Sequence, residues 1–372
     1  MPEQEIAPDC PNIACFHLFN DFSGSPIILR TVLKGLLRKG YHITLSTSRG
    51  GILDSLHDEN LRRSYYFYRF SHRPLVTMAR YAWVQLHTFF YALRYARKEN
   101  CIFYINTLLP VGPALAGRMM GKRVVYHYHE NAWIKGRVYK TLSWMMRWIA
   151  SDIVCVSDYQ RRTLLDNRKV TIVPNAVSDK FMSLAKVDEE SAFRCQTVLM
   201  ACSCKRYKGV EAFFGVAELL PQFQFLLILN ETPDKVADFL KILKLKPCAN
   251  VTVESSTDDM ASIYARASVL LNLSDRTQFI ETFGMTVAEA MCFGLPCIVP
   301  VVGGVSELVE EGETGYHVDS HDTELLVERI NLLLTDHDHY CQMSKNAALS
   351  SLKFKESKMV DAIHRLLIKK EK

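Results

Sequence analysis

The stretch from Glu281 to Gly304 combines a carboxylate, a glycine turn and a short helix in an order suited to holding a phosphate. Phe283 and Gly284 predict a turn where the backbone passes close to a ligand, because glycine has no side chain. Residues 285–293 carry apolar side chains at helical spacing, which predicts a short buried helix. Free N–H groups at its start favour an anion such as phosphate.

Two carboxylates of this stretch, Glu281 and Glu289, are eight residues apart. If Glu281 lies in the turn and Glu289 about one turn into the helix, both can border one cavity that holds a polar ligand. The spacing is equally compatible with a structural role, in which Glu289 caps or salt-bridges the helix and Glu281 accepts hydrogen bonds in the turn. The spacing alone does not choose between these interpretations.

A second candidate site is the loop SCKRYKG, residues 203–209, which follows an expected strand at 197–202 and precedes a helix. Two or three cations beside a helix start form a clamp for a diphosphate, in which lysine acts as a compact point charge. The alternative is a solvated basic turn.

The string ETFGMTVAEAMCFGLPC, followed by GG-x-x-E, resembles the E-x7-E signature of the GT4 family of glycosyltransferases, which have the GT-B fold. The resemblance extends over most of the chain and is strongest over about residues 205–316. It implies an α/β protein with two Rossmann-like, doubly wound parallel-sheet domains that face an interdomain cleft. It also implies that one sugar is transferred from a nucleotide diphosphate with retention of the anomeric configuration.

The resemblance gives the two carboxylates separate roles: Glu281 would hold hydroxyls of the donor sugar, and Glu289 would hold the ribose hydroxyls. The turn from Glu254 to Ser256 corresponds to the place where the family holds the nucleotide base. We predict His129, Glu281 and Lys208 as catalytic residues. The predicted donor-binding residues are Ser23, Gly24, Ser203, Lys205, Lys208, Glu254, Phe283, Gly284, Met285, Thr286 and Glu289.

Lys208 with Gly209 matches the family's K-G pair, and its ammonium would stabilise the leaving diphosphate. Ser203 stands where the family usually has an arginine, five positions earlier. Lys205 is the predicted replacement for that arginine, with Arg206 in reserve. Such a clamp makes a metal ion unnecessary, so we expect no metal and no cofactor.

The N-terminal half opens with strand, loop and helix, where Ser23 and Gly24 stand nearest to the paired glycines that the family often has beside the donor diphosphate. His129 follows an expected strand at 122–128 and matches a histidine that lies at the donor sugar in the family. His127 is predicted to point to the opposite face of the strand and to be structural.

Length and composition favour two globular domains. The chain has 372 residues, 48% of them hydrophobic and 23% charged. We place the acceptor-side domain at 1–178, with a C-terminal helix at about 353–372 crossing back onto it, and the donor-binding domain at 179–352. The eleven cysteines lie mostly in apolar strands, and the N-terminus lacks a secretory pattern. We therefore expect a cytoplasmic protein.

The charge is unevenly distributed: residues 1–180 carry a balance of +12 and the remainder −7. Within the basic half, residues 62–97 interleave aromatic and basic side chains with no acid between them, and predict a helix after Pro74. This helix could be packed, with solvated arginines. It could instead lie on a membrane, with aromatic side chains at the bilayer and basic ones at anionic headgroups. The residues for that arrangement are Trp83, Phe89, Phe90 and Tyr91, with Arg80, Arg94 and Arg97.

The combined features predict a glycosyltransferase that uses a UDP- or GDP-sugar and a glycan or lipid-linked acceptor. Its place would be bacterial polysaccharide or lipopolysaccharide synthesis, at the inner face of a membrane. No recognised reader motif indicates nucleic-acid binding. The alternative is a noncatalytic scaffold of the same fold, which the serine at position 203 favours; a GT-B epimerase or phosphorylase is a third interpretation.

Overall fold

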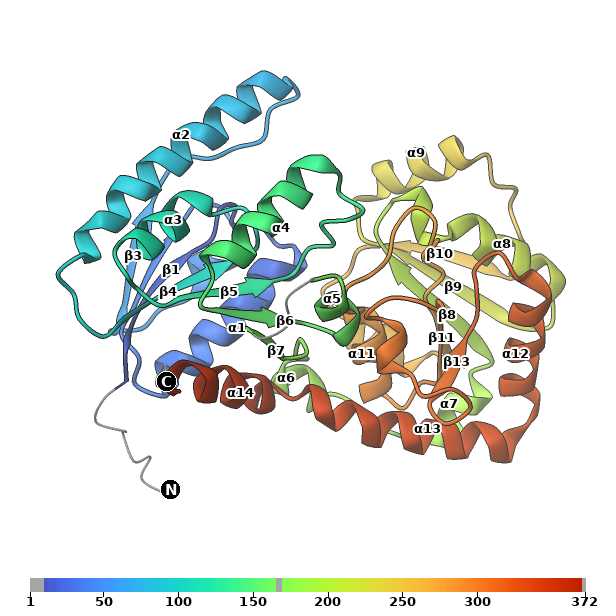
Figure 1. Cartoon of the computed structure of the whole chain (residues 1–372). Helices are drawn as coiled ribbons and strands as arrows, with labels where there is room; N and C mark the ends of the chain where they lie inside the picture. The colour runs from blue at the N-terminus through green and yellow to red at the C-terminus, as the bar shows by residue number, and fades with distance from the viewer. Residues whose placement is uncertain (1–9, 165–168, 370–372) are drawn as a thin grey trace. The chain divides into compact units, whose positions relative to one another are not determined.

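The computed structural model describes residues 10–164 and 169–369 of the chain. The described parts form two compact units. Unit 1 comprises Met1–Ala176 and Glu356–Lys372, and unit 2 comprises Val177–Lys355. These boundaries differ from the predicted ones by two residues at the first junction and three at the second. Figure 1 shows the elements of both units.

Unit 1 is built on a parallel sheet of seven strands in the order β3-β2-β1-β4-β5-β6-β7. The strands are β1 (Asn12–Phe16), β2 (Ile43–Thr47), β3 (Leu61–Tyr65), β4 (Cys101–Asn106), β5 (Val124–Tyr128), β6 (Asp152–Cys155) and β7 (Val170–Ile172). The helices are α1 (Gly24–Arg38), α2 (Pro74–Ala92), α3 (Val111–Met119), α4 (Arg137–Ile149), α5 (Asp158–Arg162) and α14 (Glu356–Ile368).

The sheet of unit 1 is covered by helices, which explains why its central strands are almost continuously apolar. One core cluster joins its strands to Ala92 of α2, Ala114 of α3 and Met146 of α4. Helix α1 packs closely against α14, since a Cβ added at Gly35 would lie 2.3 Å from a methyl carbon of Val360. The C-terminal helix is therefore part of unit 1, and residues 370–372 of the predicted segment lie outside the described residues.

Unit 2 contains a parallel sheet of six strands in the order β10-β9-β8-β11-β12-β13. The strands are β8 (Thr197–Cys202), β9 (Gln224–Leu229), β10 (Val251–Ser255), β11 (Val269–Leu271), β12 (Cys297–Val299) and β13 (Gly315–His317). The helices are α6 (Asp179–Met182), α7 (Glu189–Arg194), α8 (Val210–Leu219), α9 (Pro233–Leu243), α10 (Met260–Ala265), α11 (Met285–Cys292), α12 (Thr323–Thr335) and α13 (His337–Ser351).

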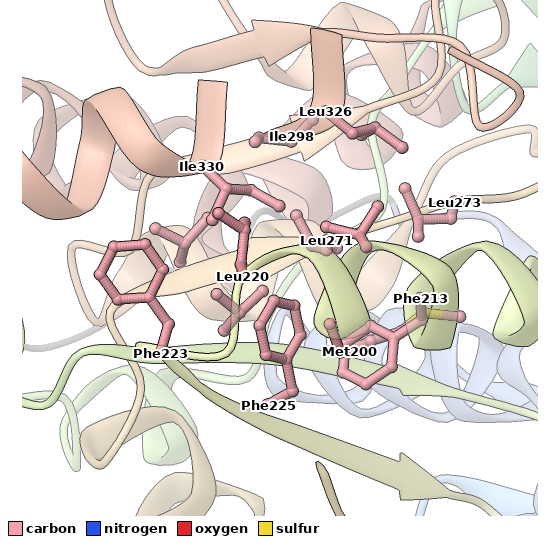
Figure 2. Packing of buried hydrophobic residues seen from close by; sticks show 14 of the residues in the cluster. Met200, Phe213, Leu220, Phe223, Phe225, Leu271, Leu273, Ile298, Leu326 and Ile330 are labelled. Atoms are coloured by element: carbon pink, nitrogen blue, oxygen red, sulfur yellow. The ribbon is translucent and has the colours of Figure 1, made fainter. Parts of the chain in front are cut away.

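The core of unit 2 joins β8, β9 and β11 to α8 and α12 (Figure 2). Phe213 of α8 and Phe225 of β9 meet edge to face, with ring centroids 5.3 Å apart. Leu326 and Ile330 of α12 close the same cluster. This core fixes the carboxyl ends of β8 and β11, from which the loops with the predicted donor-binding residues extend.

Helix α2 begins at Pro74, as the sequence predicted, and has one face on the core of unit 1 and one in solvent. Val84, Thr88 and Ala92 are buried, and Phe89 and Tyr91 pack partly against the core. Phe89 and Tyr91 therefore fit the packed interpretation rather than the membrane one, because their positions on the helix lie beside the buried stripe. The exposed apolar side chains of this region are Leu75, Met78, Trp83, Leu86, Phe90 and Leu93.

Candidate functional site

The predicted donor-binding residues of unit 2 lie at the point where the strand order of its sheet reverses. Strands β8 and β11 are neighbours, although two further strands lie between them in the sequence. Lys208 ends a 3-10 helix, Arg206–Lys208, that follows β8, and Glu281 lies in the loop that follows β11. In doubly wound sheets, ligands bind outside the carboxyl ends of the strands at such a switch point.

The side chains of Lys208 and Glu281 form an ion pair. Ser274 also donates a hydrogen bond to the same carboxylate oxygen, at 2.9 Å. Only 17% of the lysine side chain and 12% of the glutamate side chain are exposed. Burial would raise the pKa of Glu281, but Lys208, Ser274 and Asn272 outweigh burial and lower it. Glu281 is therefore held as a carboxylate.

Two aromatic rings lie beside the ammonium of Lys208. Its Nζ is 4.8 Å from the centroid of Phe279, which stacks on Tyr207 with the centroids 4.7 Å apart. A cation over a ring face is attracted by the ring's quadrupole. These rings, together with Glu281, fix the position of the ammonium group.

The main chain of Glu281 is fixed by the double-glycine loop that follows β12. Gly304 donates its N–H to the carbonyl of Glu281 at 2.8 Å, and Ser306 Oγ donates to the carbonyl of Gly303 at 2.7 Å. Neighbouring strands thus supply both the carboxylate and its support. The GG-x-x-E string is connected to the first glutamate of the signature by this contact.

Helix α11 begins next to this carboxylate, at Met285. Gly284 has φ 109°, and a Cβ there would lie 2.6 Å from a methyl carbon of Val305, so a side chain would be both strained and obstructed. No side chain caps the helix start, which leaves the N–H groups of Met285 and Thr286 without intrahelical acceptors. The ring of Phe283 is buried and meets Phe354 edge to face, so only its backbone faces the turn.

Glu289 lies one turn into α11 and has a different environment from Glu281. Tyr264 of α10 donates its hydroxyl to Glu289 Oε2 at 2.9 Å. Burial raises the pKa of Glu289 to about 7, and the bond from Tyr264 offsets only part of this effect. The two glutamates of the signature therefore differ in charge near neutral pH. Sequence reasoning missed Tyr264 and Ser274, which no motif marks.

Some of the remaining predicted residues of unit 2 form ion pairs within the unit, and others are exposed. Arg266, just after α10, donates to both carboxylate oxygens of Glu254, at 2.7 and 2.8 Å. Arg206, the reserve replacement for the missing arginine, is paired with Glu211 at 2.8 Å. Lys205 is exposed, and its N–H donates to the carbonyl of Ser203 at 2.7 Å. Among the described residues, the ammonium of Lys205 therefore has no carboxylate partner, whereas the guanidinium of Arg206 has one.

In unit 1, His129 follows β5 and is part of a buried polar cluster. Its Nε2 donates to Asn106 Oδ1 at 3.1 Å, and Asn106 Nδ2 donates to His17 Nδ1 at 3.0 Å. Asn106 ends β4 and His17 follows β1, so three neighbouring strands meet here at their carboxyl ends. Burial lowers the pKa of His17 to about 4 and that of His129 well below its ordinary value. Both rings are therefore neutral.

The prediction that His127 faces away from His129 is wrong. The two rings lie with their centroids 4.1 Å apart, because residues two positions apart along a strand share one face. His127 is nevertheless engaged within unit 1, since its Nδ1 bonds the hydroxyl of Tyr104 at 2.8 Å. Glu130 accepts from the N–H of Leu108 at 3.1 Å and stabilises a loop.

Ser23 and Gly24 form the start of α1. The N–H and the hydroxyl of Ser23 both donate to Asp21 Oδ1, at 3.0 and 2.6 Å. A Cβ at Gly24 would have no protein atom within 4 Å. The helix start is therefore open on the side of Gly24.

The described residues contain one group of three side chains that could together hold a metal ion, namely Glu190, His337 and Cys341. All three belong to α7 and α13, and none is a predicted site residue. His337 Nε2 already bonds Glu190 at 2.7 Å. Among the helices that the structure describes, none is both long enough and apolar enough to cross a membrane.

Two family models match the chain, one in each half. The model described as Glycosyltransferase Family 4 matches residues 22–181, and the model described as Glycosyl transferases group 1 matches residues 193–350. Together they leave out little more than the termini and a short central segment.

Two curated relatives are named as enzymes. N-acetyl-alpha-D-glucosaminyl L-malate synthase of Bacillus anthracis is 31% identical over 142 residues, which are 36% of this chain and 35% of the relative. D-inositol 3-phosphate glycosyltransferase of Corynebacterium jeikeium is 24% identical over 202 residues, 51% of this chain and 47% of the relative. The chain thus matches between a third and a half of the length of these relatives.

Solved structures resemble the chain over nearly its whole length. HepE of Anabaena, solved in complex with UDP and glucose, has a TM-score of 0.75 and 17% identity, and the match covers 96% of this chain and 99% of HepE. WaaG, a glycosyltransferase involved in lipopolysaccharide biosynthesis, has a TM-score of 0.67 and 16% identity, with 96% and 100% covered. At these identities the likeness shows the fold.

Proposed function

This chain belongs to the GT4 family of glycosyltransferases, and on that premise we propose that it transfers one sugar from a nucleotide-diphosphate donor to a glycan or lipid-linked acceptor. The observation that carries the proposal is the Lys208–Glu281 pair at the switch point of unit 2, beside the uncapped start of α11. This arrangement offers one cation and free N–H groups to a diphosphate, and one carboxylate to sugar hydroxyls.

The chemistry follows from the charges. Negative charge grows on the diphosphate as it leaves, and preorganised groups that face this charge lower the barrier. Lys208 would move from Glu281 to the diphosphate, the N–H groups of Met285 and Thr286 would donate to it, and Lys205 would add a second cation. Glu281, released from the lysine, would then accept hydrogen bonds from the sugar hydroxyls.

Two further groups complete the proposed reaction. Glu289 would accept hydrogen bonds from the ribose hydroxyls once it is ionised. The neutral ring of His129, held by Asn106, would orient the donor sugar. We propose that the anomeric configuration is retained, as the family resemblance implies, and that no metal ion takes part.

The donor is proposed to be a UDP- or GDP-sugar, a choice that the complex of HepE with UDP and glucose supports for UDP. The test is thermal unfolding of the full chain with UDP-, GDP-, CMP- and ADP-sugars, each with EDTA and with added Mg²⁺. A ligand that binds only the native state raises the melting temperature according to its occupancy. We expect the largest rise with a UDP- or GDP-sugar and an equal rise in EDTA.

The same assay on Lys208→Met shows whether the rise depends on the proposed clamp, and Lys241→Met on the exposed surface of α9 is the matched control. A rise that survives in Lys208→Met, or no rise with any nucleotide sugar, contradicts the proposal. Release of free nucleotide in the presence of water alone then separates a catalyst from a noncatalytic scaffold.

We also propose that unit 1 rests on the inner face of an anionic membrane, as expected for an enzyme of bacterial cell-surface polysaccharide or lipopolysaccharide synthesis. The support is the exposed apolar face of α2, where Trp83 is 68% and Phe90 66% exposed, and the absence of any acid from residue 62 to 97. Indole and phenyl rings enter the headgroup region, while basic side chains attract anionic lipids.

The membrane proposal is tested by sedimentation with vesicles of phosphatidylglycerol and phosphatidylcholine, against vesicles of phosphatidylcholine alone. We expect binding to the anionic vesicles only, and a reduction of at least about 100-fold in Trp83→Ser/Leu86→Ser, because each buried apolar side chain contributes about 1.5–3 kcal/mol. Leu219→Ser, at a similarly exposed leucine of α8 in unit 2, is the control. Equal binding of both proteins, or none to either vesicle, contradicts it.

A further inference from the structure

Unit 1 contains a cavity of about 600 Å³ that the donor site of unit 2 does not explain. It lies where three parallel strands end, since its walls come from the segments that follow β1, β2 and β3. Ligands of parallel α/β sheets bind at this edge, and the volume suits a ligand of one or two sugar rings. The cavity is lined by Phe19, Asn20, Ser48, Arg49, Gly50, Tyr65, Tyr66, Phe67, Tyr68 and Arg69.

Half of this lining is aromatic, and the rings are held in place. The hydroxyl of Tyr66 donates to the carbonyl of His17 at 2.6 Å, which ties the loop after β3 to the end of β1. Phe19, Tyr68 and Phe70 meet edge to face, with centroids 5.1 to 6.1 Å apart. Rigid aromatic walls offer flat apolar faces to the C–H groups of a sugar ring, and hydroxyls at their edges.

Two arginines give the cavity a positive charge. The guanidinium of Arg49 lies over the ring of Tyr65, 4.5 Å from its centroid, and Arg69 is exposed at the end of the same wall. Among the described residues, no carboxylate forms an ion pair with either guanidinium. Because a guanidinium matches carboxylate and phosphate oxygens with two parallel hydrogen bonds, this pair is suited to an anionic group.

Asp54, the acid nearest to Arg49 in the sequence, already accepts hydrogen bonds from the loops that line the cavity. Asp54 accepts from the side-chain amide of Asn20 at 3.0 Å and from the N–H of Gly50 at 2.7 Å. Asn20 in turn donates its N–H to Ser48 Oγ at 2.9 Å and accepts from the N–H of Leu53 at 3.0 Å. These bonds preform one wall of the cavity, and among the described residues they leave the two arginines without a compensating carboxylate.

We propose that this cavity binds the acceptor and that the acceptor is a sugar bearing an anionic group, either a carboxylate or a phosphate. The inference rests on the proposed glycosyltransferase activity. The aromatic rings contact the apolar faces of the sugar, and Arg49 and Arg69 bind its anionic group. Charge then distinguishes the acceptor from neutral sugars of the same size.

The test is direct binding, measured by saturation-transfer NMR on the full chain with the donor site saturated by UDP. The probes are glucuronic acid for a carboxylate, glucose 6-phosphate for a phosphate, and glucose as the neutral counterpart. We expect at least one anionic probe to bind fivefold or more tightly than glucose, and the probe that does so identifies the anion. Equal affinities for all three overturn the proposal.

The variant Arg49→Gln/Arg69→Gln is expected to reduce the affinity for the anionic probe to that for glucose. Arg97→Gln, at an exposed arginine outside the cavity, is the matched control. Both substituted arginines are exposed, so folding is retained, and an unchanged melting temperature verifies it. An anion preference that survives in the double variant overturns the proposal.

A third variant separates this inference from the proposed function. Lys208→Met removes the donor clamp of unit 2 and is expected to leave binding of the anionic probe unchanged. If nucleotide sugars stabilise the native protein but no anionic probe binds, the cavity proposal fails and the proposed function stands. If the anionic probe binds but no nucleotide sugar does, the proposed function fails instead.

Discussion

In unit 2 the ammonium of Lys208 is paired with Glu281 and largely covered, whereas in unit 1 Arg49 and Arg69 are exposed and have no carboxylate partner in the part of the chain that the structure describes. A ligand that uses Lys208 must compete with an ion pair inside a protected site. A ligand that uses the arginines meets no such competition, but their charges are screened by water and salt.

The difference bears on selectivity. If Lys208 belongs to the donor site, as proposed, only a strongly charged group that also engages the start of α11 should displace Glu281 from it, and weak anions should be rejected. The proposed acceptor cavity of unit 1 would select by two weaker criteria, ring shape and charge. Substitutions at the donor site should therefore have large effects on the chemical step, and substitutions around the cavity should have small effects on acceptor affinity.

The largest expected effect is that of Lys208→Met. Because the substitution removes the cation proposed to meet the leaving diphosphate, we expect the rate of sugar transfer to fall by about 100- to 1,000-fold. The measurement is the rate of nucleotide release with saturating donor and acceptor. Lys241→Met on α9 is expected to keep the wild-type rate.

The same substitution leaves Glu281 buried without its partner, which destabilises the unit, as removal of one member of a buried pair does. Lys208→Met/Glu281→Gln removes both charges and is expected to recover most of the melting temperature without recovering activity. If Lys208→Met is folded and its transfer rate stays within threefold of the wild type, the ion pair has no catalytic role.

The next largest loss of activity is expected in unit 1, from substitution of Asn106, which forms hydrogen bonds to both His129 and His17. Asn106→Ala releases the ring of His129, and a misplaced group near the reacting centre can cost up to about 100-fold in rate. We expect kcat to fall while the affinity for the donor nucleotide stays the same.

Asn346→Ala is the matched control, since Asn346 on α13 forms hydrogen bonds only at the surface of unit 2, as a donor to Glu313 and an acceptor from Gln342, among the residues that the structure describes. Equal losses in both variants, or a loss in Asn106→Ala that resides entirely in KM, contradict an orienting role for Asn106.

Much of the scaffold could be predicted, because local patterns determine it. Apolar runs bounded by glycine correspond to buried strands, and Pro74 begins α2 because proline is tolerated at the first helical position. The helix expected from residue 285 ends at Cys292, one residue short of the prediction. The loop residues Lys208 and Glu281 were identified because they belong to local motifs, the K-G pair and the E-x7-E string.

Partners distant in sequence could not be predicted. Tyr264 reaches Glu289 across 25 positions, and no spacing rule relates α10 to α11. The cavity of unit 1 takes its walls from three separate connections, of which none carries a motif. The sequence left the orientation of Phe89 open because helical spacing identifies an apolar stripe but not its edges, which depend on the helices packed beside it.

The third prediction concerns pH and uses the difference between the two glutamates of unit 2. The pKa of Glu289 is about 7, so the fraction ionised rises about tenfold between pH 6 and pH 8. If only the carboxylate holds the ribose hydroxyls, donor affinity should rise about tenfold over this range. Glu281, whose pKa is lowered, should contribute no change there.

Glu289→Gln should abolish this pH dependence of donor affinity. In the wild type, stability should change with pH in the opposite sense to donor affinity. An acid whose folded pKa is raised binds an extra proton in the native state between about pH 4.5 and 7, so its presence lowers the free energy of unfolding as pH rises. Over this window the free energy of unfolding of the wild type should therefore fall by at most about 3 kcal/mol, and that of the variant should not fall. Parallel stability profiles would show that the environment of Glu289 is not as described.

The smallest expected effect is that of Gly50→Ala at the rim of the cavity in unit 1. Gly50 has φ 100°, and a Cβ there would have no protein atom within 4 Å, so the substitution introduces backbone strain without a clash. Strain of this kind costs about 1–2 kcal/mol. Part of it should be relieved by weakening the bond from Gly50 to Asp54, which shapes one wall.

We therefore expect Gly50→Ala to lower the melting temperature slightly and to weaken anionic-sugar binding about two- to fivefold, with donor affinity unchanged. Gly215→Ala in α8 of unit 2 is the counterpart, because Gly215 also faces open space but lies in a helix. Alanine there should raise stability by about 0.5–1 kcal/mol. If Gly50→Ala changed donor affinity as much as sugar binding, the cavity and the donor site would not act separately, and the contrast between the two units would not hold.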